Sequence, residues 1–142
     1  MLYSDHPMAR KPPFVLKGDH IAALTFWHGE LMNDWANQWV RYWTDGQGEF
    51  VSSAMEDTGT YLSLSWLDRI GRVDKQRMLV LRTASNYTMP PPGISAAENL
   101  QAENEGYSGL ALALESAYIV ASKVADTLMA GWHDYAENLP GQ

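Results

Sequence analysis

The stretch from Phe26 to Trp43, FWHGELMNDWANQWVRYW, decides the fold. Large apolar side chains recur in it every four residues, at Trp27, Leu31, Trp35, Trp39 and Trp43. Side chains four apart lie on one face of a helix, so the pattern predicts a helix with an aromatic stripe. The simplest interpretation is that the stripe packs against a sheet. Trp27, at the start of the helix, is also a candidate for ligand binding.

Outward from this helix, strand and helix patterns alternate. Short apolar runs predict strands at residues 14–16, 49–55 and 77–84. Further helices are expected at 58–70, 95–104 and from 110 to about 138. Such alternation predicts an α/β fold, with a mainly parallel or mixed sheet flanked by helices.

The length of 142 residues allows one domain at most. Prolines at His6-Pro7 and Pro12-Pro13 disfavour regular structure, so residues 1–13 are expected to form a leading loop. Residues 14–142 are expected to form part of a single domain. Gly71 falls where a glycine would end the helix at 58–70.

The composition narrows the classes of partner. A net charge of -7 argues against a nucleic-acid backbone, because proteins that bind it carry a basic face. The chain has no cysteine, which excludes disulfides and thiolate zinc sites. His20 and His28 have no carboxylate at a metal-type spacing, so no metal site is expected. No apolar run approaches the roughly 18 residues of a membrane helix, so no membrane span is expected in this chain. The compartment stays open.

Three groups of side chains follow the predicted strands. They are Phe26-Trp27 after the first strand, Met55-Glu56-Asp57 after the second and Ser85-Asn86 after the third. Ligands of open α/β sheets bind outside the carboxyl ends of the strands. Together the groups offer an aromatic face, two carboxylates and an amide. Such groups can hold a base by stacking and hydrogen bonds, and a sugar by its hydroxyls.

Each polar candidate also has a structural interpretation. Asp57 is more simply the N-cap of the following helix. Glu56 is as readily a solvated carboxylate. Asn86 is as readily bonded to its own loop. Arg82 lies in an apolar run, where a structural ion pair is the favoured interpretation.

From Phe14 to Asn138 the chain resembles the purine nucleoside permease family. The segments that carry the resemblance are VLKGD (15–19), FWHGELMNDWANQWVRYWTDGQG (26–48), SAMEDTGT (53–60), RMLVLRTASNYTMPPPG (77–93) and GYSGLALALESAYIVASKV (106–124). That family in turn resembles the purine nucleoside phosphorylases and nucleosidases. The resemblance implies a nucleoside phosphorylase-like fold, of which this chain would be the C-terminal half.

The resemblance also implies roles for residues. Met55-Glu56 matches the pair that holds the ribose in those enzymes, with Met55 packing on the sugar. Asn86 stands where they carry the aspartate that protonates the purine. An amide cannot act as a general acid, but it can hydrogen-bond the purine as charge develops, so Asn86 is the catalytic candidate.

Four further residues are implied to bind substrate. Trp27 or Phe26 would stack on the base, and Ser85 and Asp57 would complete the substrate-binding set. No cofactor is implied beyond phosphate as a co-substrate.

The implied function is purine nucleoside binding with cleavage of the N-glycosidic bond, by phosphorolysis or hydrolysis, in the intact parent protein. The alternative is a non-catalytic nucleoside-binding component of nucleoside uptake. The phosphate-binding loop of the phosphorylases lies in their N-terminal half, so little activity is expected of this chain alone. The oligomeric state stays open, with a homo-oligomer as one form.

Overall fold

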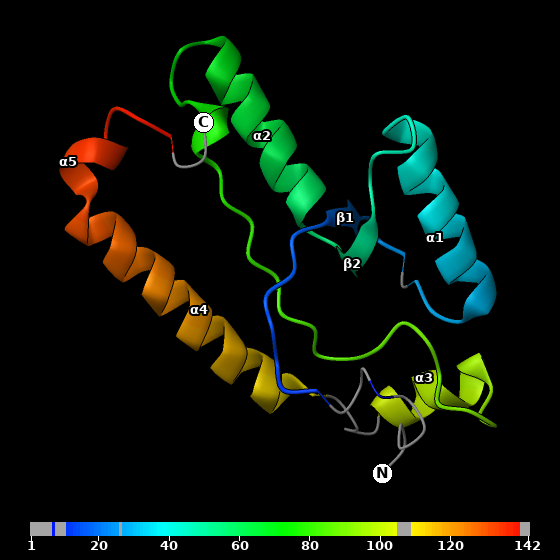
Figure 1. Ribbon diagram of the computed structural model, residues 1–142. Coiled ribbons are helices and arrows are strands. Elements are labelled where there is room, and N and C mark those ends of the chain that lie inside the picture. The colour runs from blue at the N-terminus through cyan, green and yellow to red at the C-terminus, as the bar shows by residue number, and fades with distance from the viewer. Residues whose placement is uncertain (1–6, 8–10, 26, 105–108, 140–142) are drawn as a thin grey trace. The chain divides into compact units, whose positions relative to one another are not determined.

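The computed structural model describes Pro7 and residues 11–25, 27–104 and 109–139 (Figure 1). The chain divides into two compact units. The first unit comprises Met1–Met55 and Ala84–Leu110, and the second comprises Glu56–Thr83 and Ala111–Gln142. The predicted leading loop, residues 1–13, falls mostly outside the described residues. The expectation of one domain for residues 14–142 stays a prediction.

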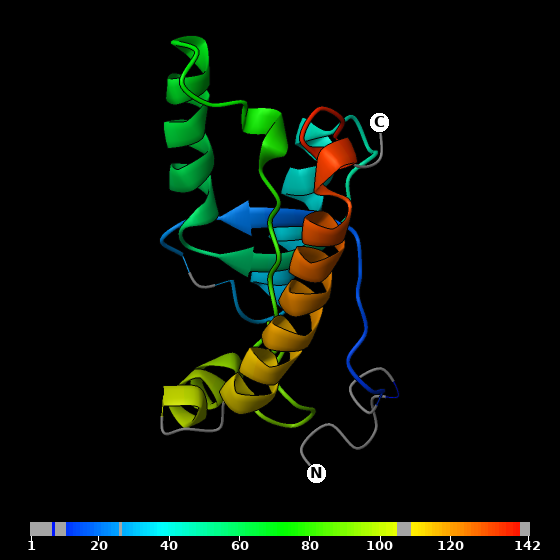
Figure 2. The same ribbon diagram turned by 90° about the vertical axis from the view of Figure 1, so that its left-hand side faces the viewer.

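The first unit contains two paired strands and two helices. They are β1 (Asp19–Ala22), α1 (Glu30–Trp43), β2 (Phe50–Ala54) and α3 (Ala96–Asn104). The strands pair in parallel, with His20 opposite Ser52 and Ala22 opposite Ala54. Figure 2 shows their arrows side by side and pointing the same way. Parallel strands need a long crossover between them, and α1 provides it.

The strand expected at residues 14–16 is not formed, so that prediction is wrong. These three residues are 53% to 71% exposed. The strand starts later, because the Asp19 N–H donates to the Glu49 carbonyl at 2.8 Å and the Asp19 carboxylate accepts from the Glu49 N–H at 2.8 Å. This two-way contact fixes the start of β1 beside β2.

Helix α1 begins at Glu30, four residues later than predicted. Gly29 interrupts the pattern, because its φ of 86° lies in the left-handed region and its N–H donates to the Thr88 carbonyl at 2.8 Å. The Asn33 amide donates to the same carbonyl at 2.8 Å, and the Thr88 hydroxyl donates back to Asn33 at 2.6 Å. These contacts join two distant parts of the chain.

The buried part of the first unit is small. The buried residues described in it are Trp27, His28, Gly29, Ala36, Val40, Gly48, Pro91 and Asn99. The aromatic stripe was expected to pack against a sheet, but Trp35, Trp39 and Trp43 are 42%, 43% and 66% exposed. The buried face of α1 is therefore set by the small side chains of Ala36 and Val40.

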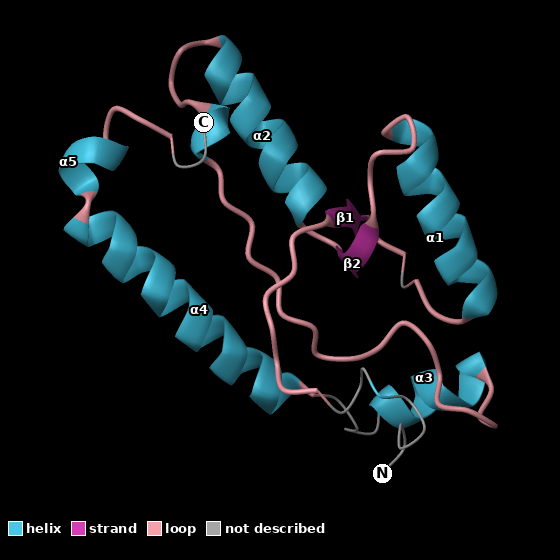
Figure 3. Cartoon of the chain, in the orientation of Figure 1, coloured by secondary structure: helices cyan, strands magenta, loops and turns pink. Residues whose placement is uncertain are grey.

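The second unit is helical (Figure 3). It contains α2 (Asp57–Arg69), the short 3₁₀ helix η2 (Lys75–Arg77), most of α4 (Leu110–Ala130) and α5 (Trp132–Tyr135). The strand expected at 77–84 is not formed; after η2 this stretch has no regular structure. The long helix predicted to about 138 ends at Ala130, before Gly131. In the described residues, no helix combines the length and apolar character needed to span a membrane.

Helix α2 ends as its sequence predicts. Gly71 has a φ of 70°. Its N–H donates to the Asp68 carbonyl at 2.9 Å, and the Arg72 N–H donates to the Leu67 carbonyl at 2.9 Å. This pair of hydrogen bonds is a Schellman motif, which satisfies carbonyls at the helix end.

Polar contacts hold the second unit together. The Arg77 guanidinium donates to the carbonyls of Tyr135 and Ala136 at 3.1 and 2.8 Å. The Lys75 ammonium lies 5.7 Å from the centroid of the Tyr61 ring, within the range of a cation–π contact. Helix α2 has no buried residue, and Ala113 is the buried apolar residue described in this unit.

Candidate functional site

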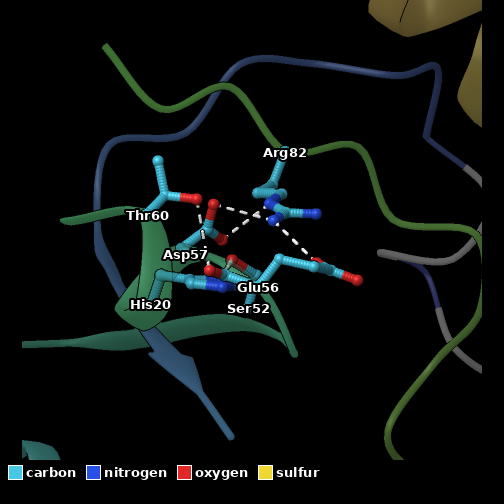
Figure 4. A network of polar contacts seen from close by, with 6 residues as sticks. All are labelled: His20, Ser52, Glu56, Asp57, Thr60 and Arg82. Atoms are coloured by element: carbon cyan, nitrogen blue, oxygen red, sulfur yellow. Dashed lines mark hydrogen bonds and ion pairs between the residues drawn. The ribbon is translucent and has the colours of Figure 1, made fainter. Parts of the chain in front are cut away.

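Arg82 joins two of the predicted site residues in the second unit (Figure 4). Its Nε donates to Asp57 Oδ2 at 2.7 Å, and its Nη2 lies 2.7 Å from Asp57 Oδ1. Nη2 also donates to Glu56 Oε2 at 3.0 Å. The planar guanidinium therefore meets Asp57 at two points and Glu56 at one, the geometry that arginine favours with carboxylates.

The electrostatics of this cluster follow from the contacts. The hydrogen bond to Asp57, followed by that to Glu56, raises the pKa of Arg82 against the opposing effect of desolvation. Two carboxylates side by side would repel each other, and the shared guanidinium compensates them. Arg82 thus forms the ion pair that the sequence favoured.

The N-cap interpretation of Asp57 is wrong. The helix boundary places Glu56 at the N-cap, without a side-chain capping hydrogen bond, and Asp57 is the first helical residue. The Asp57 side chain turns instead to Arg82. A carboxylate in the first turn still interacts favourably with the helix dipole.

Glu56 is held but accessible. Its side chain is 69% exposed, whereas that of Asp57 is 19% exposed. Met55, which follows β2 in the first unit, is 47% exposed. The Arg82 contact restricts the Glu56 carboxylate without covering it, so Glu56 can present oxygen acceptors to a ligand.

The third predicted group, Ser85 and Asn86, lies in the first unit. The Ser85 carbonyl accepts from the Gly109 N–H at 2.5 Å. Asn86 is half-buried, and its side chain has no hydrogen-bond partner within the described residues. The loop-anchoring alternative for Asn86 required local backbone hydrogen bonds of its side chain, and the part of the chain that the structure describes shows none. Its amide is available for a ligand.

Trp27 precedes α1 and is 7% exposed. The Trp27 ring stacks on the ring of Trp35, which belongs to α1 (Figure 1). The ring centroids lie 4.8 Å apart and the angle between the ring planes is 3°, so Trp35 covers one face of the Trp27 ring. The role of Trp27 in stacking on a base stays a prediction. Phe26, the alternative ring, lies outside the described residues.

A buried polar cluster around His28 was missed by the sequence reasoning. His28 Nε2 lies 3.3 Å from the Asn99 amide nitrogen, on α3. Burial lowers the pKa of His28, while the charge of Glu103 and a backbone contact with Tyr87 raise it. Trp27 Nε1 and Glu103 Oε2 are buried as well. The only sequence signal was the unusual Trp-His-Gly run, because Asn99 lies 71 residues away in sequence.

The remaining polar residues of the first unit have structural contacts. His20 Nδ1 lies 2.9 Å from the Ser52 hydroxyl, across the two strands (Figure 4). Asp19 is bonded to the backbone of Glu49. Over the described ranges, His, Asp and Glu side chains form no group of three that could hold a metal ion.

Comparison with known proteins places these residues in a family. The family model for purine nucleoside permease matches residues 1–140. A purine nucleoside permease of Candida albicans is 28% identical over 126 residues, which is 89% of this chain and 30% of the relative. A probable purine nucleoside permease of Schizosaccharomyces pombe is 24% identical over 124 residues, which is 87% of this chain and 35% of the relative. No solved structure matches.

These matches correct the functional expectation. The sequence pointed to cleavage of the N-glycosidic bond, with nucleoside uptake as the alternative. The family and both relatives are described as permeases, so the cleavage reading is wrong and the uptake alternative fits better. The chain spans about a third of the length of these relatives.

Proposed function

Because the chain belongs to the purine nucleoside permease family, we propose that it forms part of a protein that binds purine nucleosides during their uptake. The observation that carries the proposal is the family match over residues 1–140, which includes every candidate binding residue. The names of the relatives specify purine nucleosides, and the polar groups of this chain suit that class of ligand.

The ribose would be held by Glu56. A carboxylate can accept hydrogen bonds from two neighbouring hydroxyls, which a ribose presents. Arg82 fixes one carboxylate oxygen of Glu56 at 3.0 Å while the side chain stays 69% exposed. A restrained carboxylate loses less conformational entropy on binding than a mobile one.

In the first unit, taken by itself, Asn86 suits a purine base. Its amide can donate and accept at once, which matches the mixed donor and acceptor edge of a purine. The half-buried position without a protein partner leaves this capacity unused. Ser85 precedes it in the same loop and adds a hydroxyl. The parallel β1–β2 pair joined through α1 supports a nucleoside phosphorylase-like fold, which stays part of the proposal.

Direct binding tests the proposal. Equilibrium dialysis of labelled inosine, adenosine and guanosine against the purified chain is expected to give saturable binding, with uridine much weaker. Glu56→Gln should weaken purine nucleoside binding about tenfold, because a neutral amide is a poorer acceptor than a carboxylate. Glu115→Gln, the same change at an exposed position of α4, is the matched control.

Measurement of nucleoside uptake by cells tests the proposed role in transport. Yeast cells that lack nucleoside uptake and express the gene should accumulate labelled purine nucleoside, and chromatography should recover it intact. Recovery of free base as the first labelled product would argue for cleavage instead. Equal affinity for uridine and inosine, or no saturable binding of any purine nucleoside, would remove the proposal.

A further inference from the structure

We propose that Trp27 and Glu103 recognise the polar edge of the purine base. The Trp27 indole N–H would donate to an acceptor on the base, and the Glu103 carboxylate would accept from an N–H of the base. The inference rests on the proposed binding of purine nucleosides. It gives Trp27, expected from the sequence to stack on the base, a contact through its edge, and it adds Glu103, which neither the sequence pattern nor the family match assigns to a ligand.

The proposal starts from two buried atoms. Trp27 Nε1 and Glu103 Oε2 are shielded from solvent and have no hydrogen-bond partner within the described residues. Trp27 as a whole is 7% exposed. Native proteins pair the great majority of such groups, because an unpaired buried donor or acceptor is destabilising. A ligand that supplies one acceptor and one donor would satisfy both.

Both residues are linked to His28. Trp27 is its chain neighbour. Asn99, which contacts the imidazole at 3.3 Å, and Glu103 are four residues apart on α3 and so share a face of that helix. The charge of Glu103 acts on the imidazole directly. Trp27 is thus the chain neighbour of His28, Glu103 acts on His28 through its charge, and both residues belong to the same unit of the structure.

The chemistry of the cluster selects the ligand edge. A purine base presents a donor and an acceptor next to each other: an amino group and a ring nitrogen in adenine, a ring N–H and a carbonyl in the 6-oxopurines. Trp35 covers one face of the Trp27 ring. Contact through the indole edge therefore leaves the Trp27–Trp35 stack intact, whereas the N–H would remain unpaired in a purely stacked complex.

The two contacts can be separated by choice of ligand. Inosine carries a base N–H, whereas purine riboside carries ring acceptors but no N–H on its base. Binding of both ligands to the full chain is measured by calorimetry. Glu103→Gln should weaken the binding of inosine about fivefold and the binding of purine riboside less than twofold, because only the base of inosine has an N–H that can donate to Glu103. Trp27→Phe should weaken both ligands by a similar factor of about five.

Matched controls exist for both variants. Glu98→Gln changes an exposed glutamate on the same helix, and glutamine preserves the capping box with Ser95. Trp39→Phe changes a ring that also stacks on Trp35 at 4.8 Å but is 43% exposed. Neither control should alter the preference for inosine over purine riboside. Far-UV circular dichroism establishes that each variant is folded. Glu103→Gln and Trp27→Phe test separate contacts, so either result can be interpreted alone.

The outcomes separate this inference from the proposed function. If the unaltered chain binds inosine and a folded Glu103→Gln loses equal affinity for both ligands, or none, the assigned contact is wrong while nucleoside binding stands. The same holds for Trp27 if Trp27→Phe leaves both affinities unchanged. If the unaltered chain binds no purine nucleoside, the proposed function fails and this inference fails with it.

Discussion

Asp57 and Arg82 form a two-point ion pair, with Nε to Oδ2 and Nη2 to Oδ1 both at 2.7 Å. The same guanidinium reaches Glu56, so one cation organises two carboxylates at the start of α2. The pair fixes the carboxylate that we propose for ribose binding.

Arg82→Lys should lower the free energy of unfolding by about 1 kcal/mol, because an ammonium cannot meet Asp57 at two points. The partial exposure of the pair keeps the effect small. Urea denaturation measures it. A double-mutant cycle with Asp57→Asn should give a favourable coupling energy, and additive effects would show that the two side chains act independently. Arg72→Lys serves as the control.

Gly71→Ala should lower the free energy of unfolding by about 1 kcal/mol, because alanine is strained at the φ of 70° that the Schellman motif requires. Gly59→Ala is the internal comparison. Gly59 lies within α2, and an added methyl group there meets no atom within 4 Å. Alanine favours the helix by about 0.5–1 kcal/mol, so this variant should be more stable. Thermal denaturation of both variants measures effects of opposite sign; effects of the same sign would contradict the helix boundary.

Acid should destabilise the first unit through His28. Burial lowers the pKa of the imidazole below its ordinary value of 6.5 in the folded state. The unfolded chain then binds more protons, so stability is complete above about pH 6.5 and is lost as the pH falls from there to the folded pKa. For one proton the slope cannot exceed about 1.4 kcal/mol per pH unit.

Urea denaturation between pH 5 and pH 7 tests this slope, in His28→Gln and in the unaltered chain. His28→Gln should flatten it. His133→Gln, at a residue whose side chain is 79% exposed, should leave it unchanged. An identical slope in all three proteins would assign the acid sensitivity to other groups.

Asn86→Ala should weaken purine nucleoside binding about tenfold, because it removes a donor and an acceptor together. Asn86→Asp keeps the shape but loses the donor, so it should alter the preference between adenosine and inosine. Asn37→Ala, at an exposed amide of α1 that bonds to the Asn33 carbonyl, should bind normally. Dialysis with both nucleosides checks the three variants, and unaltered affinity in Asn86→Ala would exclude this residue from the site.

Local signals in the sequence predicted α2, α3 and β2 well. The strand expected at 49–55 is confirmed as β2, Phe50–Ala54, and the helix expected at 58–70 as α2, Asp57–Arg69. Both have clear boundaries: Gly46 and Gly48 precede β2, and Gly71 follows α2. The capping box of Ser95 and Glu98 likewise fixed the start of α3.

The predictions of secondary structure were wrong where contacts between residues distant in sequence determine whether a strand forms. An apolar run becomes a strand only if a neighbour accepts its hydrogen bonds, and residues 14–16 and 77–84 have no such neighbour among the described residues. Asp19, in contrast, has a hydrogen-bonding neighbour in Glu49, which lies 30 positions away in the sequence. For the same reason the sequence predicted an ion pair for Arg82 but could not identify Asp57 as its partner. It gave no prediction of the contact between His28 and Asn99.

The contacts of Thr88 with Gly29 and Asn33 have a consequence for synthesis. Asn33 and Thr88 lie 55 positions apart along the chain, and residues 56–83 of the second unit are translated between them. The first unit cannot complete its closure until Thr88 has left the ribosome, and closing so long a loop carries an entropic cost. During that interval the nascent β1–α1–β2 segment lacks the contacts that Thr88 makes with Gly29 and Asn33, and it should be the stretch that chaperones and proteases meet first.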